Sequence, residues 1–162
     1  MSVNLGVNPT EVVSGISGTD DSGTVKVGTI GYVGAKEYVY LQANGDITLG
    51  DLVGVANAGQ ARSVSTPRAD KTSSLAIALA DVKNDEYAWF QTVGDCEVRV
   101  IQDAISVGEQ LFTHATDVGV VRKSGGGAGK RISGLTLTKS RIASGGTLTL
   151  SAFLFHPYID RV

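Results

Sequence analysis

The sequence predicts an all-β fold in a single domain. Val and Ile number 20 and 9 against 12 Leu, and glycine accounts for 21 of the 162 residues. Branched side chains suit a pleated sheet, and glycine supplies turn conformations that are closed to other residues. A short stretch that occurs twice, at residues 47–55 and 105–113, adds the signature of a repeated supersecondary unit. The chain length suits one domain with a sizeable core.

The repeated stretch reads ITLGDLVGV in the first copy and ISVGEQLFT in the second. We expect Gly50 and Gly108 to let the chain bend between strands, and Asp51 and Glu109 to keep each bend solvated. The repeated setting of the two acids suits turn hydrogen bonds better than an acid/base pair. The aliphatic residues before each glycine are expected to point into the core, and they are Ile47, Leu49, Ile105 and Val107.

An extended N-terminal arm is predicted over residues 1–23, followed by a β-rich domain over residues 24–162. Aliphatic residues in the arm are scattered among Asn, Ser, Thr and Gly and develop no long periodic run. Their side chains need a surface outside their own segment, which is either the body of the domain or a neighbouring chain. The arm residues assigned to partner binding are Val3, Leu5, Val7, Val12 and Val13.

Strand signals sharpen from residue 24 onward. TVKVGTIGYV alternates, and KEYVYLQA ends at Asn44 and Gly45, a pair that predicts a hairpin with a type I′ turn. The segment 66–82 is ambiguous, because its aliphatic residues fit a helix face as well as a strand. The polar run at residues 83–86 separates it from YAWFQTV, which favours a hairpin and places Trp89 in the core or at a subunit contact.

The second half of the chain predicts further strands. In CEVRVI, Cys96 shares one strand face with Val98 and Val100, which indicates a buried packing residue rather than a nucleophile or a disulfide partner. The tail predicts a last pair of strands around the glycines at 145 and 146. In the final strand Phe153 and Phe155 lie opposite the leucine face, which predicts a strand covered on both sides there.

Charge and motif content assign no catalytic, cofactor or metal site. With 14 basic and 16 acidic residues, the net charge of −2 argues against a nucleic-acid or anionic-membrane binder. The sequence has no apolar run long enough to span a membrane, and its start lacks the features of a signal peptide, so synthesis in the cytoplasm is expected.

Individual motifs also assign no catalytic, cofactor or metal site. SGGGAGKR at residues 124–131 departs from the phosphate-loop pattern and is interpreted as a surface loop. Neither His114 nor His156 has a Cys, Asp or Glu at ligand or triad spacing. Asp81, Asp85 and Glu86 match no calcium-binding loop and are interpreted as a solvated turn. A small-molecule ligand is therefore not expected.

The order GDLVGV, then LAIALADVKNDEYAWFQTVGDCEVRV, then VGEQLFTHATDVGVV resembles the small capsid decoration (cement, or head stabilisation) proteins of tailed bacteriophages. The resemblance covers residues 24–158 and rests on spacing and residue class. It implies a β-barrel-like or β-sandwich domain, often a homotrimer, on the outer surface of the capsid at three-fold or quasi-three-fold sites. It also implies a non-enzymatic virion protein that binds the major capsid protein and stabilises the shell. The long arm departs from the family pattern.

A second function class remains open from the sequence. A carbohydrate-binding or adhesin-type virion module would use exposed aromatic residues as a platform for a sugar. The candidates for this platform are Tyr38, Tyr40, Tyr87 and Trp89. All four lie within alternating runs, as core residues do, which favours the structural interpretation.

Overall fold

The computed structural model describes residues 7–13, 25–56, 59–65, 74–101, 104–123, 129–140 and 145–160. Within these ranges the regular structure is all β, with eleven strands in one mixed sheet, which confirms the predicted fold class. The strands are β1 (Val12–Val13), β2 (Ile30–Val33), β3 (Lys36–Ala43), β4 (Leu52–Val55), β5 (Gln60–Ser63), β6 (Ser74–Ala78), β7 (Tyr87–Ile101), β8 (Leu111–Thr113), β9 (Val121–Arg122), β10 (Arg131–Leu137) and β11 (Thr147–Ile159).

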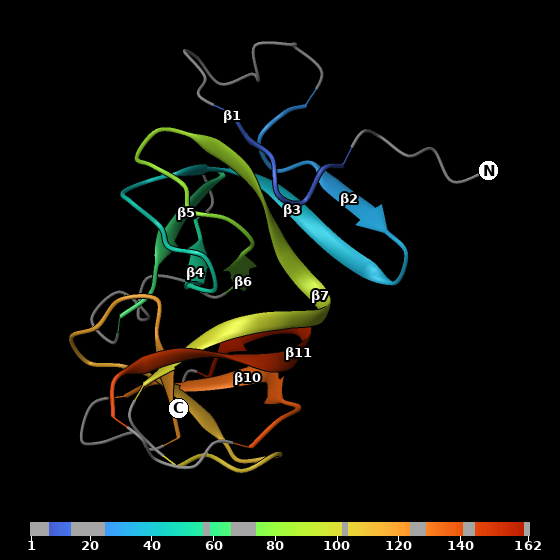
Figure 1. Cartoon of the computed structure of the whole chain (residues 1–162). Coiled ribbons are helices and arrows are strands. Elements are labelled where there is room, and N and C mark those ends of the chain that lie inside the picture. Colours follow the sequence, from blue (N-terminus) through green and yellow to red (C-terminus); the bar gives the residue numbers. More distant parts are fainter. Residues whose placement is uncertain are drawn as a thin grey trace.

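The strands form two closed circuits that share β7. In the first circuit, β7 pairs with β3, β3 with β5, β5 with β4, β4 with β6, and β6 again with β7. In the second, β7 pairs with β9, β9 with β8, β8 with β10, β10 with β11, and β11 again with β7. Figure 1 shows the first circuit above the second, with β7 passing through both. The sheet thus closes into a ring but is not a regular barrel.

A bend in the middle of β7 lets one strand serve both circuits. Its first part pairs with β3 and its second part with β11, and Val93 takes part in both ladders. The next residue, Gly94, has a φ of 103°. A Cβ there would lie 2.8 Å from the Cγ of Lys36, so the bend requires glycine both for its conformation and for the close approach. We call this region the waist of the molecule (Figure 1).

The repeat seen in the sequence has a counterpart in the topology. In each circuit a long strand, β3 or β7, is followed by an antiparallel hairpin, β4–β5 or β8–β9, whose second strand runs parallel to the long strand. Gly54 of β4 pairs with Arg62 of β5 and with Leu75 of β6. Phe112 of β8, at the equivalent repeat position, pairs with Arg122 and Arg131. The two circuits are therefore two copies of one supersecondary unit.

The buried side chains form three clusters. One fills the first circuit around Leu41, Val53 and Phe90, and a larger one fills the second circuit and continues into β4 and β6. The third packs Trp89 with neighbouring tyrosines on the outside of the first circuit. Trp89 is thus a core residue, and Cys96 is buried with Val98 and Val100, both as predicted.

Two hairpin predictions had different outcomes. The one between the 66–82 segment and the YAWFQTV run is confirmed, because β6 pairs antiparallel with β7. The loop proposed before β6 lies outside the described residues. The hairpin at Asn44 and Gly45 is wrong: Gly45 has a φ of 106°, but β3 and β4 do not pair with each other. Both strands pair instead with β5, which lies between them.

Candidate functional site

The repeated turn has the same backbone geometry in both circuits. In the first copy, the Asp51 amide donates to the Thr48 carbonyl over 2.9 Å, and the Thr48 amide donates to the Asp51 carboxylate over 3.1 Å. In the second copy, the same two contacts join Ser106 and Glu109 over 3.2 and 2.8 Å. The intervening glycines have φ of 82° and 80°, as the third position of a type II turn requires. In both copies the acid therefore closes the turn, because its carboxylate accepts a hydrogen bond from the backbone amide of the first turn residue.

The two acids differ in what else they contact. The Asp51 side chain is only 3% exposed, and its carboxylate accepts from Arg99 Nη1 at 2.5 Å and from Ser63 Oγ at 2.7 Å. Glu109 is 38% exposed and lies 3.9 Å from the Lys123 ammonium. The prediction that both acids keep their bends solvated is therefore wrong for Asp51, which forms a buried ion pair with β7.

The aliphatic residues of the two turns differ in burial according to their position in the turn. Ile47 and Ile105 are buried, as predicted. Leu49 and Val107 are 48% and 56% exposed, so their placement in the core is wrong. Each is the second residue of its turn, where the chain reverses and the side chain projects outward from the hairpin entrance.

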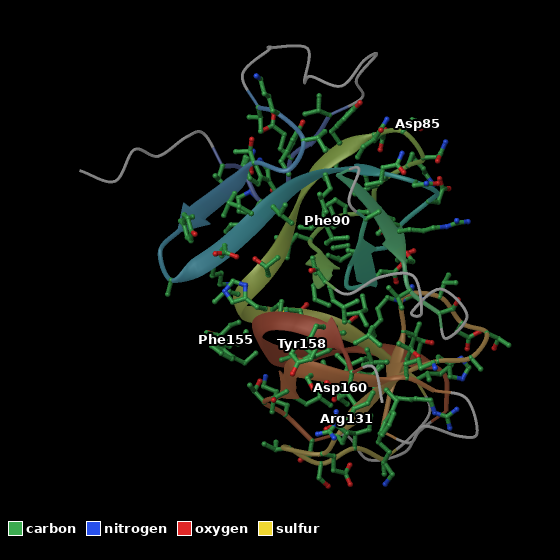
Figure 2. The ribbon with its side chains drawn as sticks, turned by 180° about the vertical axis from the view of Figure 1, so that it is seen from behind. Asp85, Phe90, Arg131, Phe155, Tyr158 and Asp160 are labelled. Carbon is green, nitrogen blue, oxygen red and sulfur yellow. The ribbon has the colours of Figure 1, made fainter. Side chains whose placement is uncertain are left out.

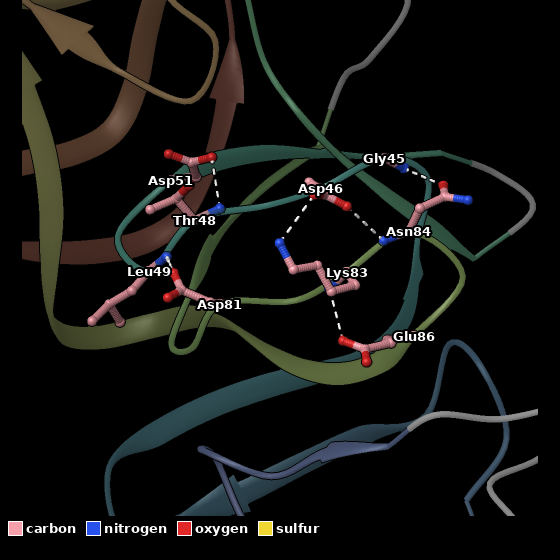
Figure 3. A network of polar contacts seen from close by, with 9 residues as sticks. All are labelled: Gly45, Asp46, Thr48, Leu49, Asp51, Asp81, Lys83, Asn84 and Glu86. Carbon is pink, nitrogen blue, oxygen red and sulfur yellow. Dashed lines mark hydrogen bonds and ion pairs between the residues drawn. The ribbon is translucent and has the colours of Figure 1, made fainter.

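A third copy of the turn joins β6 to β7; the sequence predicts a turn at residues 83–86, but not that it repeats the other two. The Glu86 amide donates to the Lys83 carbonyl, and the Lys83 amide donates to the Glu86 carboxylate over 2.7 Å. The residue with positive φ is Asp85 rather than glycine, which is why no repeat is visible here. Figure 3 shows this turn beside the first one, connected by Asp46, which accepts from the Asn84 amide and the Lys83 ammonium. The Asn84 hydrogen bond, with Lys83, lowers the pKa of the Asp46 carboxyl.

These acids do not form a metal centre. Asp81 accepts from the Leu49 amide, and Asp85 accepts from the Asn84 side chain (Figure 3 shows Asp81 and Leu49). Within the described ranges, no three His, Cys, Asp or Glu side chains gather in a way that could hold a metal ion. His114 accepts a hydrogen bond from the Asp117 amide, which fits a structural role. Among the same residues, no helix has the length and apolarity to cross a membrane.

An open groove of about 480 Å³ lies between the two circuits at the waist. Its floor includes Cys96 and Gln91, and the Gln91 amide donates to two backbone carbonyls of β7. Burial raises the pKa of the Cys96 thiol to about 12, so this thiol is no nucleophile at neutral pH. Asp95 and Glu97 line the groove as exposed carboxylates.

Exposed aromatic side chains lie beside this groove. Phe153 and Phe155 project from the same face of β11 and are 44% and 66% exposed. The prediction that this part of β11 is covered on both sides is therefore wrong within a single chain. Figure 2 shows Phe155 standing out from the side of the waist.

A hydrogen-bonded network holds the surroundings of Phe155 in place. Tyr32 of β2 donates to Glu37 over 2.9 Å, and this bond, together with the carboxylate charge, raises the pKa of the Tyr32 phenol. Glu37 also accepts from Thr92 over 2.7 Å and lies 3.5 Å from the His156 ring, which contacts the Phe155 ring edge-on. Exposed aromatic rings on a fixed framework are typical of protein-binding surfaces.

The sequence carries a signal for this exposed surface. Phe153 and Phe155 continue a row of Thr and Ser side chains on β11, opposite the row of the partly buried Leu150 and the buried Leu154. A row of hydroxyl residues marks a solvent face, so aromatic residues that continue it are expected to be exposed. Tyr32 carried no such signal, because its neighbours in β2 are apolar as well.

The proposed sugar platform is buried. Tyr38, Tyr40, Tyr87 and Trp89 are each no more than 3% exposed and pack together, with Tyr40 at 5.2 Å from Trp89 between ring centroids. Burial also raises the pKa of the Tyr38 phenol. These rings cannot stack on a sugar in this fold.

The described part of the predicted arm lies against the domain body. Val12 and Val13 form β1, which pairs with Ala88 and Tyr87 of β7. Val7 packs against the buried aromatic cluster, and a Cβ on Gly31 would lie 2.4 Å from its methyl group. Val3 and Leu5 lie outside the described residues, so partner binding by the arm remains a prediction.

Comparison with known proteins finds the fold in a phage capsid. No family model matches the chain, and no curated protein matches it. A chain in a solved structure described as the capsid of Myoviridae phage XM1 superposes with a TM-score of 0.54 at 12% identity. The match covers 94% of this chain and 97% of that chain. At this identity the likeness shows a shared fold over nearly the whole length of both chains.

Proposed function

We propose that the chain is a structural component of a phage capsid that binds the outer surface of the shell and stabilises it. The observation that carries the proposal is the end-to-end fold likeness to a chain of the XM1 capsid. The sequence resemblance to decoration proteins supports the same role. The exposed aromatic surface at the waist supports a function in protein contacts. By the same resemblance, the protein acts as a homotrimer at three-fold or quasi-three-fold sites, without catalysis.

Co-sedimentation tests this function directly. Expanded shells of the encoding phage, prepared without this protein, are mixed with the purified chain and pelleted. The proposal expects saturable binding and a higher melting temperature of the decorated shells. A chain that stays in the supernatant at all ratios would show that the proposed function is wrong.

The arm can be tested separately from the fold. Val7, Val12 and Val13 pack on the domain, so a deletion that includes them would also expose the buried aromatic cluster. Removing only residues 2–6 leaves β1 and its contacts in place. If the arm anchors the protein, this deletion abolishes shell binding without lowering the melting temperature of the free chain. Retained binding would assign anchoring to the domain body instead.

A further inference from the structure

The sheet ends at β2, and the outer edge of this strand is open. In the described part of the chain, β2 pairs with β3 and with no other strand, and it is the last strand in the order of the sheet. Figure 1 shows β2 at the rim of the first circuit, beside β3. The Tyr40 amide donates to the Thr29 carbonyl, so the alternation of an antiparallel ladder directs the backbone groups of Gly31 toward β3 as well. The amides and carbonyls of Ile30 and Tyr32 therefore point away from the sheet.

This edge lacks the features that usually prevent pairing between edges. Its sequence is IGYV, which carries no charge and no proline. Ile30, Tyr32 and Val33 are 44%, 63% and 39% exposed, so three of the four residues present apolar or aromatic side chains to solvent. Natural proteins usually protect an open edge with lysine, proline, a bulge or a covering segment. An open apolar edge is therefore expected to be covered in the assembled protein.

The edge is complementary to a second copy of itself. Antiparallel pairing about a two-fold axis at Gly31 places Ile30 of each copy opposite Tyr32 of the other. The two amides and two carbonyls that point outward from each copy then all form hydrogen bonds. An axis at Ile30 or at Tyr32 would pair only one of these residues with β2 and would direct the other onto Gly28 or Gly34, outside the strand. The axis at Gly31 therefore uses the edge most completely.

The side chains suit the same register. Gly31 faces the buried aromatic cluster, since a Cβ there would overlap a methyl group of Val7 and lie 3.1 Å from the Trp89 ring. Ile30 and Tyr32 therefore point to the opposite face of β2. About the axis at Gly31, the Tyr32 ring of one copy lies opposite Ile30 of the other, and an aromatic ring opposite a β-branched side chain is a favourable cross-strand pair.

We propose that β2 pairs antiparallel with β2 of a second copy, so that the sheets of the two copies become continuous. The contact is isologous, because the same four residues meet from both sides. A two-fold contact cannot build a ring of three, so it is distinct from the contact within the proposed trimer and joins neighbouring assemblies. A stable interface uses about 20 to 30 residues a side. We therefore expect a weak contact between free chains and a stronger one where many copies are held side by side.

Disulfide trapping tests both the contact and its register. Ile30→Cys and Tyr32→Cys are prepared as single variants and oxidised separately and as an equimolar mixture, and dimer formation is followed over time on non-reducing gels. The Cα atoms of a hydrogen-bonded antiparallel pair lie about 5.5 Å apart, which a disulfide can span. The mixture should cross-link at least about tenfold faster than either variant alone, because a cysteine faces a cysteine only in the mixture.

Val107→Cys supplies the matched control, because Val107 is 56% exposed and lies on a turn of the second circuit. Its mixture with Ile30→Cys measures cross-linking by random collision and should be as slow as the single variants. The native Cys96 does not compete, because burial raises the pKa of its thiol to about 12. Adding Ile30→Pro to the Tyr32→Cys chain removes an amide that faces the open edge and none that faces β3. This change should slow trapping with little effect on the melting temperature.

Three results would overturn the contact. A mixture that cross-links no faster than the Val107→Cys control would show that the two edges do not meet in this register. Trapping that occurs only after residues 2–6 are removed would assign the edge to the chain's own N-terminal segment. A Tyr32→Cys thiol that shells protect from labelling, in a mixture that does not cross-link, would assign the edge to a strand of the shell protein. The inference does not rest on the proposed function, so shell binding is scored separately and either result can fail alone.

Discussion

Removing the buried carboxylate of Asp51 should destabilise the protein far more than removing its repeat counterpart. The Asp51 carboxylate joins the turn before β4 to Arg99 of β7 and is satisfied by Ser63 and by the Thr48 amide. Breaking a buried ion pair by removing one partner costs about 3 to 5 kcal/mol. Because the Arg99 side chain is 27% exposed and can be hydrated, Asp51→Ala is expected at the lower end, about 3 kcal/mol. For a chain of this size that corresponds to a fall in melting temperature of roughly 10 °C.

The internal repeat supplies the matched control for this prediction. Glu109→Ala removes the same turn-closing carboxylate from a partly exposed site and should cost about 0.5 kcal/mol or less. Urea unfolding followed by the fluorescence of Trp89, the single tryptophan, measures both free energies of unfolding. Equal losses in the two variants would refute the reasoning that burial, rather than the turn itself, makes Asp51 important.

Three further predictions concern packing and protonation. Gly119→Ala should lower the free energy of unfolding in urea by about 2 to 4 kcal/mol, because φ there is 74° and an added Cβ would overlap the Asp51 carboxylate. Gly108→Ala should cost only about 1 kcal/mol, because the space around that glycine is open. Equal costs in the two variants would contradict this reasoning. Cys96 should resist thiol reagents at pH 8 until the chain unfolds, since its pKa is about 12, and fast labelling of the native protein would show the site to be open. Asp46→Asn should destabilise the protein more at pH 7 than in acid. A lowered carboxyl pKa stabilises the fold above pH 3.8, and this contribution is lost as the pH falls through the folded pKa. Thermal melts that show the same loss at pH 7 and in acid would exclude this origin.

Local sequence patterns predict where the strands lie, but they do not predict which strands pair when the partner strand is distant in the sequence. Alternation in β7 and β11 correctly gave the buried face of Cys96 and the pairing of two long strands near the chain end, because a half-buried strand shows its face directly in the sequence. The Asn44-Gly45 signal gave the bend but the wrong partner. A turn fixes only where the chain reverses, and here β5 takes the place beside β3 that a hairpin would have given to β4.

The repeat shows the same limit at the level of single residues. Its hydrogen-bonding pattern follows from residue types, yet nothing in the sequence distinguishes Asp51 from Glu109, since burial of the first comes from Arg99 and Gly119, which are remote in sequence. The likeness of the third turn to the other two is not visible in the sequence, because Asp85 replaces glycine at the position with positive φ. The exposure of Phe153 and Phe155 differs from the predicted covered face, because that prediction gives the two aromatic rings more weight than the Thr and Ser row that they continue.

Electron microscopy of decorated shells tests the central claim most directly. Expanded shells that lack the protein are imaged before and after incubation with the purified chain. The account predicts added density on the outer surface, at three-fold or quasi-three-fold positions, into which the two-circuit fold fits as three copies. Shells that gain no outer density under saturating protein, or density only on the inner surface, would contradict it.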